Sequence, residues 1–166
     1  GAVVPHPYSF DRRFGGQGQG MDGAGGHVNK TSLNLFTSRF VTQDIDICAA
    51  LTLENLSGLL AALADIRPRF RTTRDLRPLP DEAEKLKGYK NLYLITDLGQ
   101  LDILSEITGV GEYAEVEQHT IEVDLDGVPC RVLDLDTLIT AKKAMNSPKD
   151  RQAVVELEAI RERLRR

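Results

Sequence analysis

Residues 42–47 have the sequence TQDIDI, in which two aspartates alternate with two isoleucines. Strict alternation of this kind is typical of a half-buried strand, so Ile45 and Ile47 are predicted to face a core. Asp44 and Asp46 then lie next to each other on the opposite face. Two carboxylates that close repel each other unless a cation lies between them. The stretch therefore predicts both a core strand and a cation-binding position.

The same alternation recurs at residues 101–104, which have the sequence LDIL. Leu101 and Ile103 are predicted to point inward and Asp102 outward. If this strand lies beside the first one, three carboxylates converge on one point. Such a cluster of hard oxygen ligands suits a divalent metal that holds substrate phosphates.

The composition of the whole chain is that of an ordinary globular protein. Its 166 residues are 41% apolar and 28% charged, which favours one domain with a sizeable core. The net charge of −4 argues against nucleic acid as the default partner, because duplex-binding proteins normally carry a basic surface. No apolar run approaches the roughly 20 residues of a membrane span, so no membrane partner is expected. Cys48 and Cys130 are predicted to be buried, reduced thiols of a cytoplasmic protein.

The chain divides into two regions of different composition. Residues 1–26 contain eight of the fourteen glycines and show no apolar periodicity. They are predicted to be a leader that is either flexible or derived from an expression vector. Residues 27–166 are predicted to form the folded domain. Within it, residues 28–37 fit either a short helix or an irregular stretch.

Regular periodicity from residue 40 onward predicts a mixed fold of helices and strands. Thr52 is the predicted N-cap of the first helix, and residues 74–88 are expected to be a surface loop with one helical turn. The order of the elements indicates the α/β or α+β class, with one mixed, mostly antiparallel sheet flanked by helices. The expected strands are 40–48, 70–73, 92–96, 101–104, 120–125 and 128–133, and the expected helices are 53–66, 135–145 and 149–165.

Several motifs occur in an order that resembles a known family. Residues 39–48 match R-x-x-T-x-D-I-D-I-C, an amphipathic helix follows, and residues 96–104 match T-D-L-G-x-L-D-I-L. Together with the later segments, they resemble the minimal nucleotidyltransferases of the DNA polymerase β superfamily over about three quarters of the chain, residues 39–165. The later segments are ITGVG at 107–111, VPCRVL at 128–133 and a lysine-containing helical segment at 135–150.

The resemblance implies a nucleotidyltransferase fold and a metal-dependent reaction. In such an enzyme, two Mg²⁺ ions, or Mn²⁺ in their place, bridge a nucleoside triphosphate and activate an attacking hydroxyl, and pyrophosphate leaves. Asp44, Asp46 and Asp102 would be both the catalytic residues and the metal ligands. Four further residues are implied for nucleotide binding, namely Arg39, Thr42, Lys142 and Lys149.

The superfamily also has a glycine-rich turn that binds phosphates through backbone N–H groups. The nearest candidate for this nucleotide-binding turn is Gly25-Gly26, and seventeen residues separate Gly26 from Asp44. That separation is longer than is usual in the family. Either the chain has an extra helical turn there, or the phosphate-binding turn is damaged or absent.

Two functions therefore remain open. The first is an enzyme that transfers a nucleoside monophosphate from a nucleoside triphosphate to an acceptor, which could be a small molecule, a protein side chain or a tRNA end. By resemblance, such an enzyme could act with a partner protein in a toxin–antitoxin system or in a phage-defence system of the abortive-infection type. The second is a catalytically inactive protein of the same fold with a binding or regulatory role.

Each candidate site residue also has a structural alternative. Asp44 and Asp46 could be solvated residues on an exposed strand face, and Asp102 could serve the fold alone. Lys142 and Lys149 could be solvated charges on the surface of helices.

Overall fold

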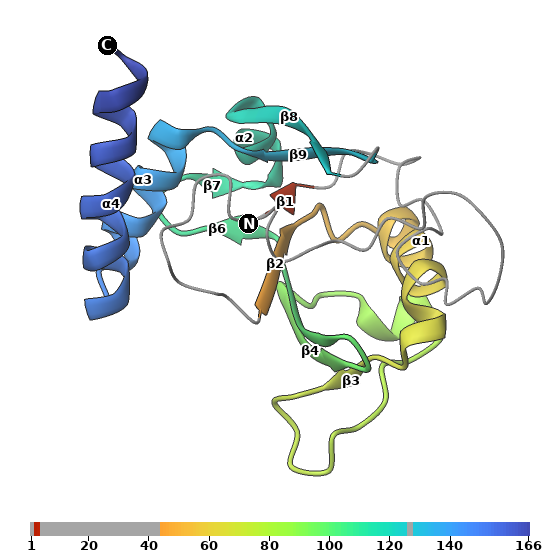
Figure 1. Ribbon diagram of the computed structural model, residues 1–166. Coiled ribbons are helices and arrows are strands. Elements are labelled where there is room, and N and C mark those ends of the chain that lie inside the picture. Colours follow the sequence, from red (N-terminus) through yellow and green to blue (C-terminus); the bar gives the residue numbers. More distant parts are fainter. Residues whose placement is uncertain (1, 4–43, 126–127) are drawn as a thin grey trace, which may run out of the picture.

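The computed structural model describes residues 2–3, 44–125 and 128–166, and these residues form a mixed α and β structure around one main sheet (Figure 1). Side by side, the strands of this sheet follow the order β3-β4-β5-β2-β1-β9-β8. Among the described strands, the β1–β2 and β2–β5 pairs are parallel and the other neighbours are antiparallel. The expected α+β class with a mostly antiparallel sheet is therefore confirmed. The strands of the sheet are β1 (Ala2–Val3), β2 (Asp44–Cys48), β3 (Arg69–Phe70), β4 (Asn91–Thr96), β5 (Gly99–Leu104), β8 (Thr120–Leu125) and β9 (Val128–Leu133).

Helix α1 (Leu53–Leu63) covers one face of the sheet. Thr52 caps it as predicted, because the Thr52 hydroxyl accepts a hydrogen bond from the Asn55 N–H at 3.3 Å. The helix buries a stripe of three leucines, Leu56, Leu59 and Leu63, against Ile47, Leu101 and Ile103 of β2 and β5. Burial of each leucine contributes about 2 kcal/mol, so this stripe fixes the helix on the sheet. A 3₁₀ turn, η3 (Ala64–Ile66), continues the helix to the expected end before Pro68.

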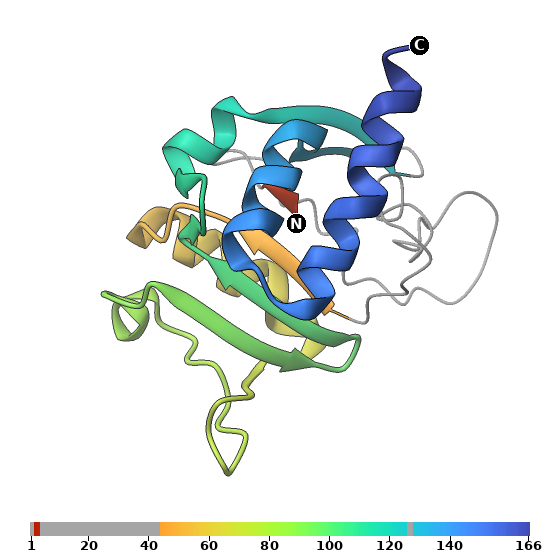
Figure 2. The same ribbon diagram turned by 90° about the vertical axis from the view of Figure 1, so that its left-hand side faces the viewer.

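The opposite face of the sheet is covered by α2 (Tyr113–Gln118) and α3 (Leu135–Met145), and α4 (Pro148–Leu164) packs on α3. Figures 1 and 2 show α3 and α4 on the side of the sheet away from α1. Cys48 of β2 is buried here with Tyr113, Val116 and Leu133. Burial raises the pKa of the Cys48 thiol to about 11, so this cysteine is protonated at neutral pH. Cys130 is a free thiol too, but it is only half-buried.

The two hairpins lie where the alternating patterns predict them. Along β4, Leu92, Leu94 and Thr96 are buried and the residues between them are half-buried. The turn from β4 to β5 is closed by Thr96, whose hydroxyl donates to the Gly99 carbonyl at 2.9 Å. Strands β8 and β9 have the predicted bounds, and residues 126–127 between them lie outside the described residues.

Some short elements were not expected from the sequence. Strands β6 (Glu106–Ile107) and β7 (Gly111–Glu112) form a separate small hairpin that leads into α2. Strand β1 lies between β2 and β9, and no strand was expected within residues 1–26, of which only residues 2–3 are described. The expected helical turn in the 74–88 loop is present as η4 (Ala83–Leu86).

Candidate functional site

The predicted carboxylates lie on two adjacent parallel strands. Asp46 of β2 is paired in register with Asp102 of β5, and Asp44 is paired with Gln100. Paired residues of neighbouring strands are about 5 Å apart, and residues two positions apart on a strand share a face. The backbone therefore places Asp46 beside Asp102 on one face of the sheet, with Asp44 two positions before Asp46 on β2. The two strands are neighbours, which is the condition on which the alternating stretches predicted a cluster of carboxylates.

The beginning of β2 has a neighbour on one side only among the described strands. Among the described strands, β1 pairs only with Ile47 and Cys48, so residues 44–46 have β5 as their one neighbour. The prediction that both isoleucines face a core is accordingly right for Ile47, which is 7% exposed, and wrong for Ile45, which is 38% exposed. The Asp46 side chain is exposed as well. Ile45 and Asp46, in the first half of β2, are therefore both exposed to solvent.

Asp102 is held by an arginine from the edge of the sheet. Arg71 Nε donates to Asp102 Oδ1 at 3.1 Å and Arg71 Nη2 donates to Asp102 Oδ2 at 2.5 Å. This two-pronged arrangement is the strongest form of an arginine–carboxylate contact. The Asp102 side chain is only 14% exposed, so the arginine supplies positive charge where water is largely excluded.

Tyr93 of β4 lies beside the Arg71–Asp102 ion pair. It is paired with Asp102 in the β4–β5 hairpin, and the Arg71 guanidinium lies 5.2 Å from the centre of its ring. Asn91 Nδ2 donates to the Tyr93 hydroxyl at 3.1 Å. The backbone N–H of Arg71 donates a hydrogen bond to the backbone carbonyl of Tyr93 at 3.0 Å. Arg71, Tyr93, Asp102 and Asp46 thus form a row across the sheet from its β3 edge to β2, which we call the carboxylate row.

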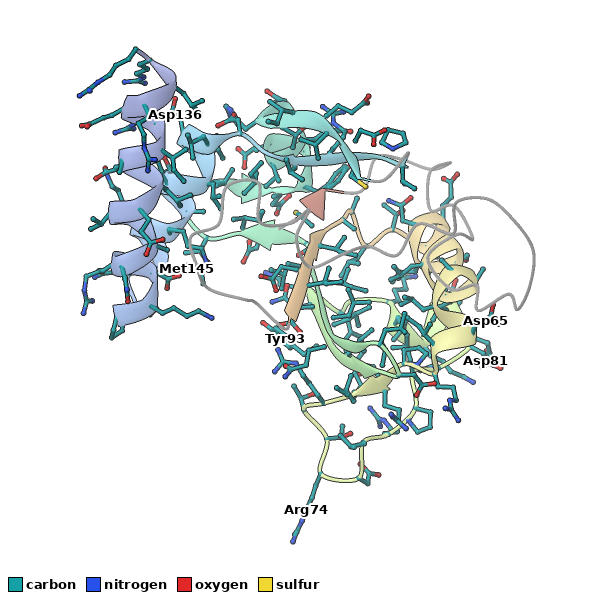
Figure 3. The ribbon with its side chains drawn as sticks, in the orientation of Figure 1. Asp65, Arg74, Asp81, Tyr93, Asp136 and Met145 are labelled. Carbon is teal, nitrogen blue, oxygen red and sulfur yellow. The ribbon has the colours of Figure 1, made fainter. Side chains whose placement is uncertain are left out.

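The carboxylate row faces the side of the sheet that carries α3 and α4. Figure 3 shows Tyr93 on this side, together with Met145 at the end of α3, whereas Asp65 and Asp81 lie on the far side near α1. Figures 1 and 2 agree that the turn between α3 and α4 is level with the Asp44 end of β2. The loop after β3 extends away from the sheet, and Arg74 points outward from its tip (Figure 3).

The two predicted phosphate-contacting lysines have different environments. Lys149 is exposed in the first turn of α4. Lys142 of α3 is half-buried, and its Nζ lies 3.1 Å from Asp150 Oδ1. Asp150 is 5% exposed and also accepts hydrogen bonds from the backbone N–H and the hydroxyl of Ser147, the N-cap of α4. In the structure, Lys142 therefore holds the α3–α4 turn together.

Asp150→Asn is expected to destabilise the protein in a pH-dependent way. Burial alone would raise the pKa of the Asp150 carboxyl, but hydrogen bonds from Ser147 and Lys142 lower this pKa overall. A lowered pKa means that the carboxylate stabilises the fold above the unfolded pKa of about 4 and loses this effect as the pH falls through the folded pKa. We expect a loss of about 2 kcal/mol at pH 7, because the variant leaves Lys142 without its counter-charge.

Urea unfolding at pH 7 and at pH 3 measures this effect. The difference in unfolding free energy between the wild type and Asp150→Asn should shrink at the lower pH. Asp136→Asn is the matched control, because the Asp136 side chain also forms an ion pair between α3 and α4, with Arg161, but is 64% exposed. Loss of this exposed pair should change the unfolding free energy by less than about 0.5 kcal/mol. Equal effects of the two variants at pH 7 would contradict the role assigned to Asp150.

The remaining predicted nucleotide-binding residues, Gly25, Gly26, Arg39 and Thr42, lie outside the described residues, and so does the side chain of Asp44. Among the described side chains, no group of three His, Cys, Asp or Glu residues is assembled for a metal ion. Asp46 and Asp102 are the two predicted ligands whose side chains the structure describes. The helices within the described ranges are all too short or too polar to cross a bilayer.

Arg71 and Tyr93 are site residues that the sequence analysis did not single out. The stretch RFR at residues 69–71 carried a signal, because it alternates charged and aromatic residues as a half-buried strand does. Phe70 is buried under α1, which turns the two arginines to the opposite face, where the aspartates lie. The pairing of β3 with β4 was needed to place Arg71 beside Asp102.

Comparison of the chain with models of known families, with curated proteins and with solved structures found no match.

Proposed function

We propose that this protein is a metal-dependent nucleotidyltransferase. It would transfer a nucleoside monophosphate from a nucleoside triphosphate to an acceptor and release pyrophosphate. The observation that supports this best is the register of β2 and β5, which puts Asp46 directly opposite Asp102 and Asp44 two residues away on the same face. Two carboxylates that face each other on neighbouring strands repel one another unless a cation lies near them, and a metal site uses this property.

The donor set fits a divalent ion such as Mg²⁺ or Mn²⁺. Asp44, Asp46 and Asp102 would hold two such ions through carboxylate oxygens, which are the ligands that hard cations prefer. Arg71 occupies both oxygens of Asp102 in the structure, so a bound ion would have to take the place of this positive charge. When bound, the ions would neutralise the triphosphate and make an acceptor hydroxyl a better nucleophile.

The side chains around the carboxylates would position the substrate. Lys149, which is exposed in the first turn of α4, would contact phosphate oxygens as a point charge. Arg39, Thr42 and the Gly25-Gly26 turn remain the proposed contacts from the preceding segment. In the transfer, the acceptor oxygen bonds to the α-phosphorus while the bond to the bridging oxygen of pyrophosphate breaks. A carboxylate of the row would accept the proton of the acceptor hydroxyl.

A binding or regulatory protein without turnover is the second candidate. The observation that favours it is that Lys142 and Asp102 are both engaged in ion pairs within the protein. In such a protein the carboxylate row would serve as an ion-pair network. A small molecule, a protein side chain and a tRNA end all remain proposed acceptors for the enzyme, and a toxin-like role with a partner protein in the cytoplasm remains a proposal as well.

Calorimetric titration with a non-hydrolysable nucleoside triphosphate tests the proposal. We expect binding in the presence of Mg²⁺ and loss of binding when Mg²⁺ is replaced by a chelator. Binding that is independent of Mg²⁺, or no binding at all, would refute the metal-dependent transferase and favour the second candidate. If binding needs Mg²⁺, release of pyrophosphate on addition of candidate acceptors would then identify the acceptor class.

A further inference from the structure

We infer that Arg71 is a built-in counter-cation of Asp102 that leaves the carboxylate when a divalent ion binds and then contacts the triphosphate. This inference rests on the proposed function, because it concerns the same carboxylates. It assigns to Arg71 two opposite effects, a lower affinity for the metal alone and a higher affinity for the nucleotide once the metal is present.

The contact between Arg71 and Asp102 blocks the carboxylate as a metal ligand. Both oxygens of Asp102 accept hydrogen bonds from the guanidinium, at 3.1 and 2.5 Å. A cation that approached Asp102 would have to share these oxygens with Arg71 or displace it. Because the Asp102 side chain is 14% exposed, the mutual repulsion of two cations there is weakly screened by solvent. Displacement of Arg71 is therefore favoured over sharing.

Without a metal, Arg71 removes an unfavourable interaction. Asp102 lies directly opposite Asp46 in the parallel pair, so two negative charges face each other on neighbouring strands. The Arg71 guanidinium compensates for the negative charge of Asp102, which is the less exposed of the two aspartates. The metal-free protein is thereby stabilised relative to a form with uncompensated carboxylates, and this stabilisation lowers the affinity for the metal by the same free energy.

After displacement, Arg71 has a support and a new partner. Its guanidinium lies 5.2 Å from the centre of the Tyr93 ring, and this contact does not require Asp102. Arg71 is 36% exposed, so its side chain has room to move on the ring. A triphosphate held at the carboxylates brings several negative charges next to the displaced guanidinium, and arginine binds phosphate oxygens in the same two-pronged way as a carboxylate.

Arg71→Gln tests both effects in one variant. Mn²⁺ binding without nucleotide is measured from the electron paramagnetic resonance signal of free Mn²⁺, and binding of a non-hydrolysable triphosphate at saturating Mg²⁺ is measured by calorimetry. We expect the affinity for Mn²⁺ to rise by about fivefold and the affinity for the triphosphate to fall by about tenfold. A residue that only supports the fold would lower both affinities together.

Arg67→Gln is the matched control. Arg67 Nε lies 2.6 Å from Asp97 Oδ2, so this variant also breaks an arginine–aspartate pair beside the β4–β5 hairpin, but one that does not involve the carboxylate row. We expect no change in either affinity. If Arg71→Gln does not fold, Arg71→Lys takes its place. Lysine keeps the positive charge but cannot bind both oxygens of a carboxylate. In Arg71→Lys, the affinity for Mn²⁺ should therefore still rise and the affinity for the triphosphate should still fall, each by less than in Arg71→Gln.

The outcomes separate this inference from the proposed function. If the wild type binds neither Mn²⁺ nor the metal–triphosphate complex, both fail. If the wild type binds both ligands and the Arg71 variants change neither affinity, or change both in the same direction, the inference about Arg71 fails and the proposed function stands. A rise in the affinity for Mn²⁺ together with a fall in the affinity for the triphosphate, with neither change in Arg67→Gln, would establish that Arg71 moves from Asp102 to the triphosphate.

Discussion

An Asp44→Asn, Asp46→Asn double variant is expected to lose metal-dependent triphosphate binding while it remains folded. It removes two of the three proposed metal ligands and replaces them with side chains of nearly the same shape. Asparagine carries no charge to compensate for a divalent ion, so we expect the affinity to fall at least about a hundredfold, which corresponds to about 2.8 kcal/mol. Calorimetry with Mg²⁺ and a non-hydrolysable triphosphate measures the loss.

The stability of the same variant separates a binding role from a structural one. The Asp46 side chain is exposed and β5 is its one described neighbouring strand, so its replacement creates no cavity. Removal of clustered like charges should leave the unfolding free energy unchanged or raise it by about 0.5 kcal/mol. A clear loss of stability would indicate that the aspartates serve the fold.

Asp65→Asn, Asp81→Asn is the control for the change in net charge. Both residues are exposed and lie on the far side of the sheet from the carboxylate row (Figure 3). This variant removes the same number of negative charges, so it should bind the metal–triphosphate complex as the wild type does. If it lost binding too, the effect of the first variant would reflect overall charge, and the assignment of Asp44 and Asp46 as ligands would fail.

Gly109→Ala is expected to cost about 3 kcal/mol of stability. Gly109 lies in the turn between β6 and β7 with φ +82°, a conformation that residues with a side chain rarely adopt. A Cβ atom at this position would lie 2.4 Å from the Ala144 Cβ of α3. The backbone of a helix cannot yield locally, so the variant must displace α3 or distort the turn.

Gly58→Ala is the same chemical change, but we expect it to stabilise the protein and not to destabilise it. Gly58 is exposed within α1, and no atom lies within 4 Å of the position that its Cβ would take. Alanine has the higher helix propensity, so this variant should gain about 0.5–1 kcal/mol. Urea unfolding of both variants measures the contrast. A neutral Gly109→Ala would mean that the β6–β7 turn does not approach α3 as closely as the structure shows.

The local elements of this protein follow from the sequence alone. The alternation in residues 42–47 predicted strand β2, and the apolar spacing after Thr52 predicted α1 with its N-cap. The C-terminal helices and the β8–β9 hairpin were predicted to within one or two residues. These patterns depend on interactions between residues that are close in the chain, so they can be read without knowledge of the fold.

The candidate site depends on contacts that no local pattern contains. The sequence indicated that Asp46 and Asp102 each face away from a core, but only the parallel pairing of β2 with β5 places them opposite each other. Similarly, Lys142, which the sequence suggested as a phosphate contact, is bound to Asp150 inside the α3–α4 turn. Ile45 is exposed although Ile47 on the same face is buried, because an alternating pattern shows which residues share a face and not how far along the strand that face is covered.

The sequence by itself determined the longer helices and strands, the mixed α and β class and the aspartates to be tested for function. The tertiary structure decided the register that brings Asp46 and Asp102 together, and the arginine that binds Asp102 from the edge of the sheet. The physical reason is the range of the interactions. Propensity, periodicity and caps act over a few residues, whereas register and ion pairs between strands depend on how distant segments share one core.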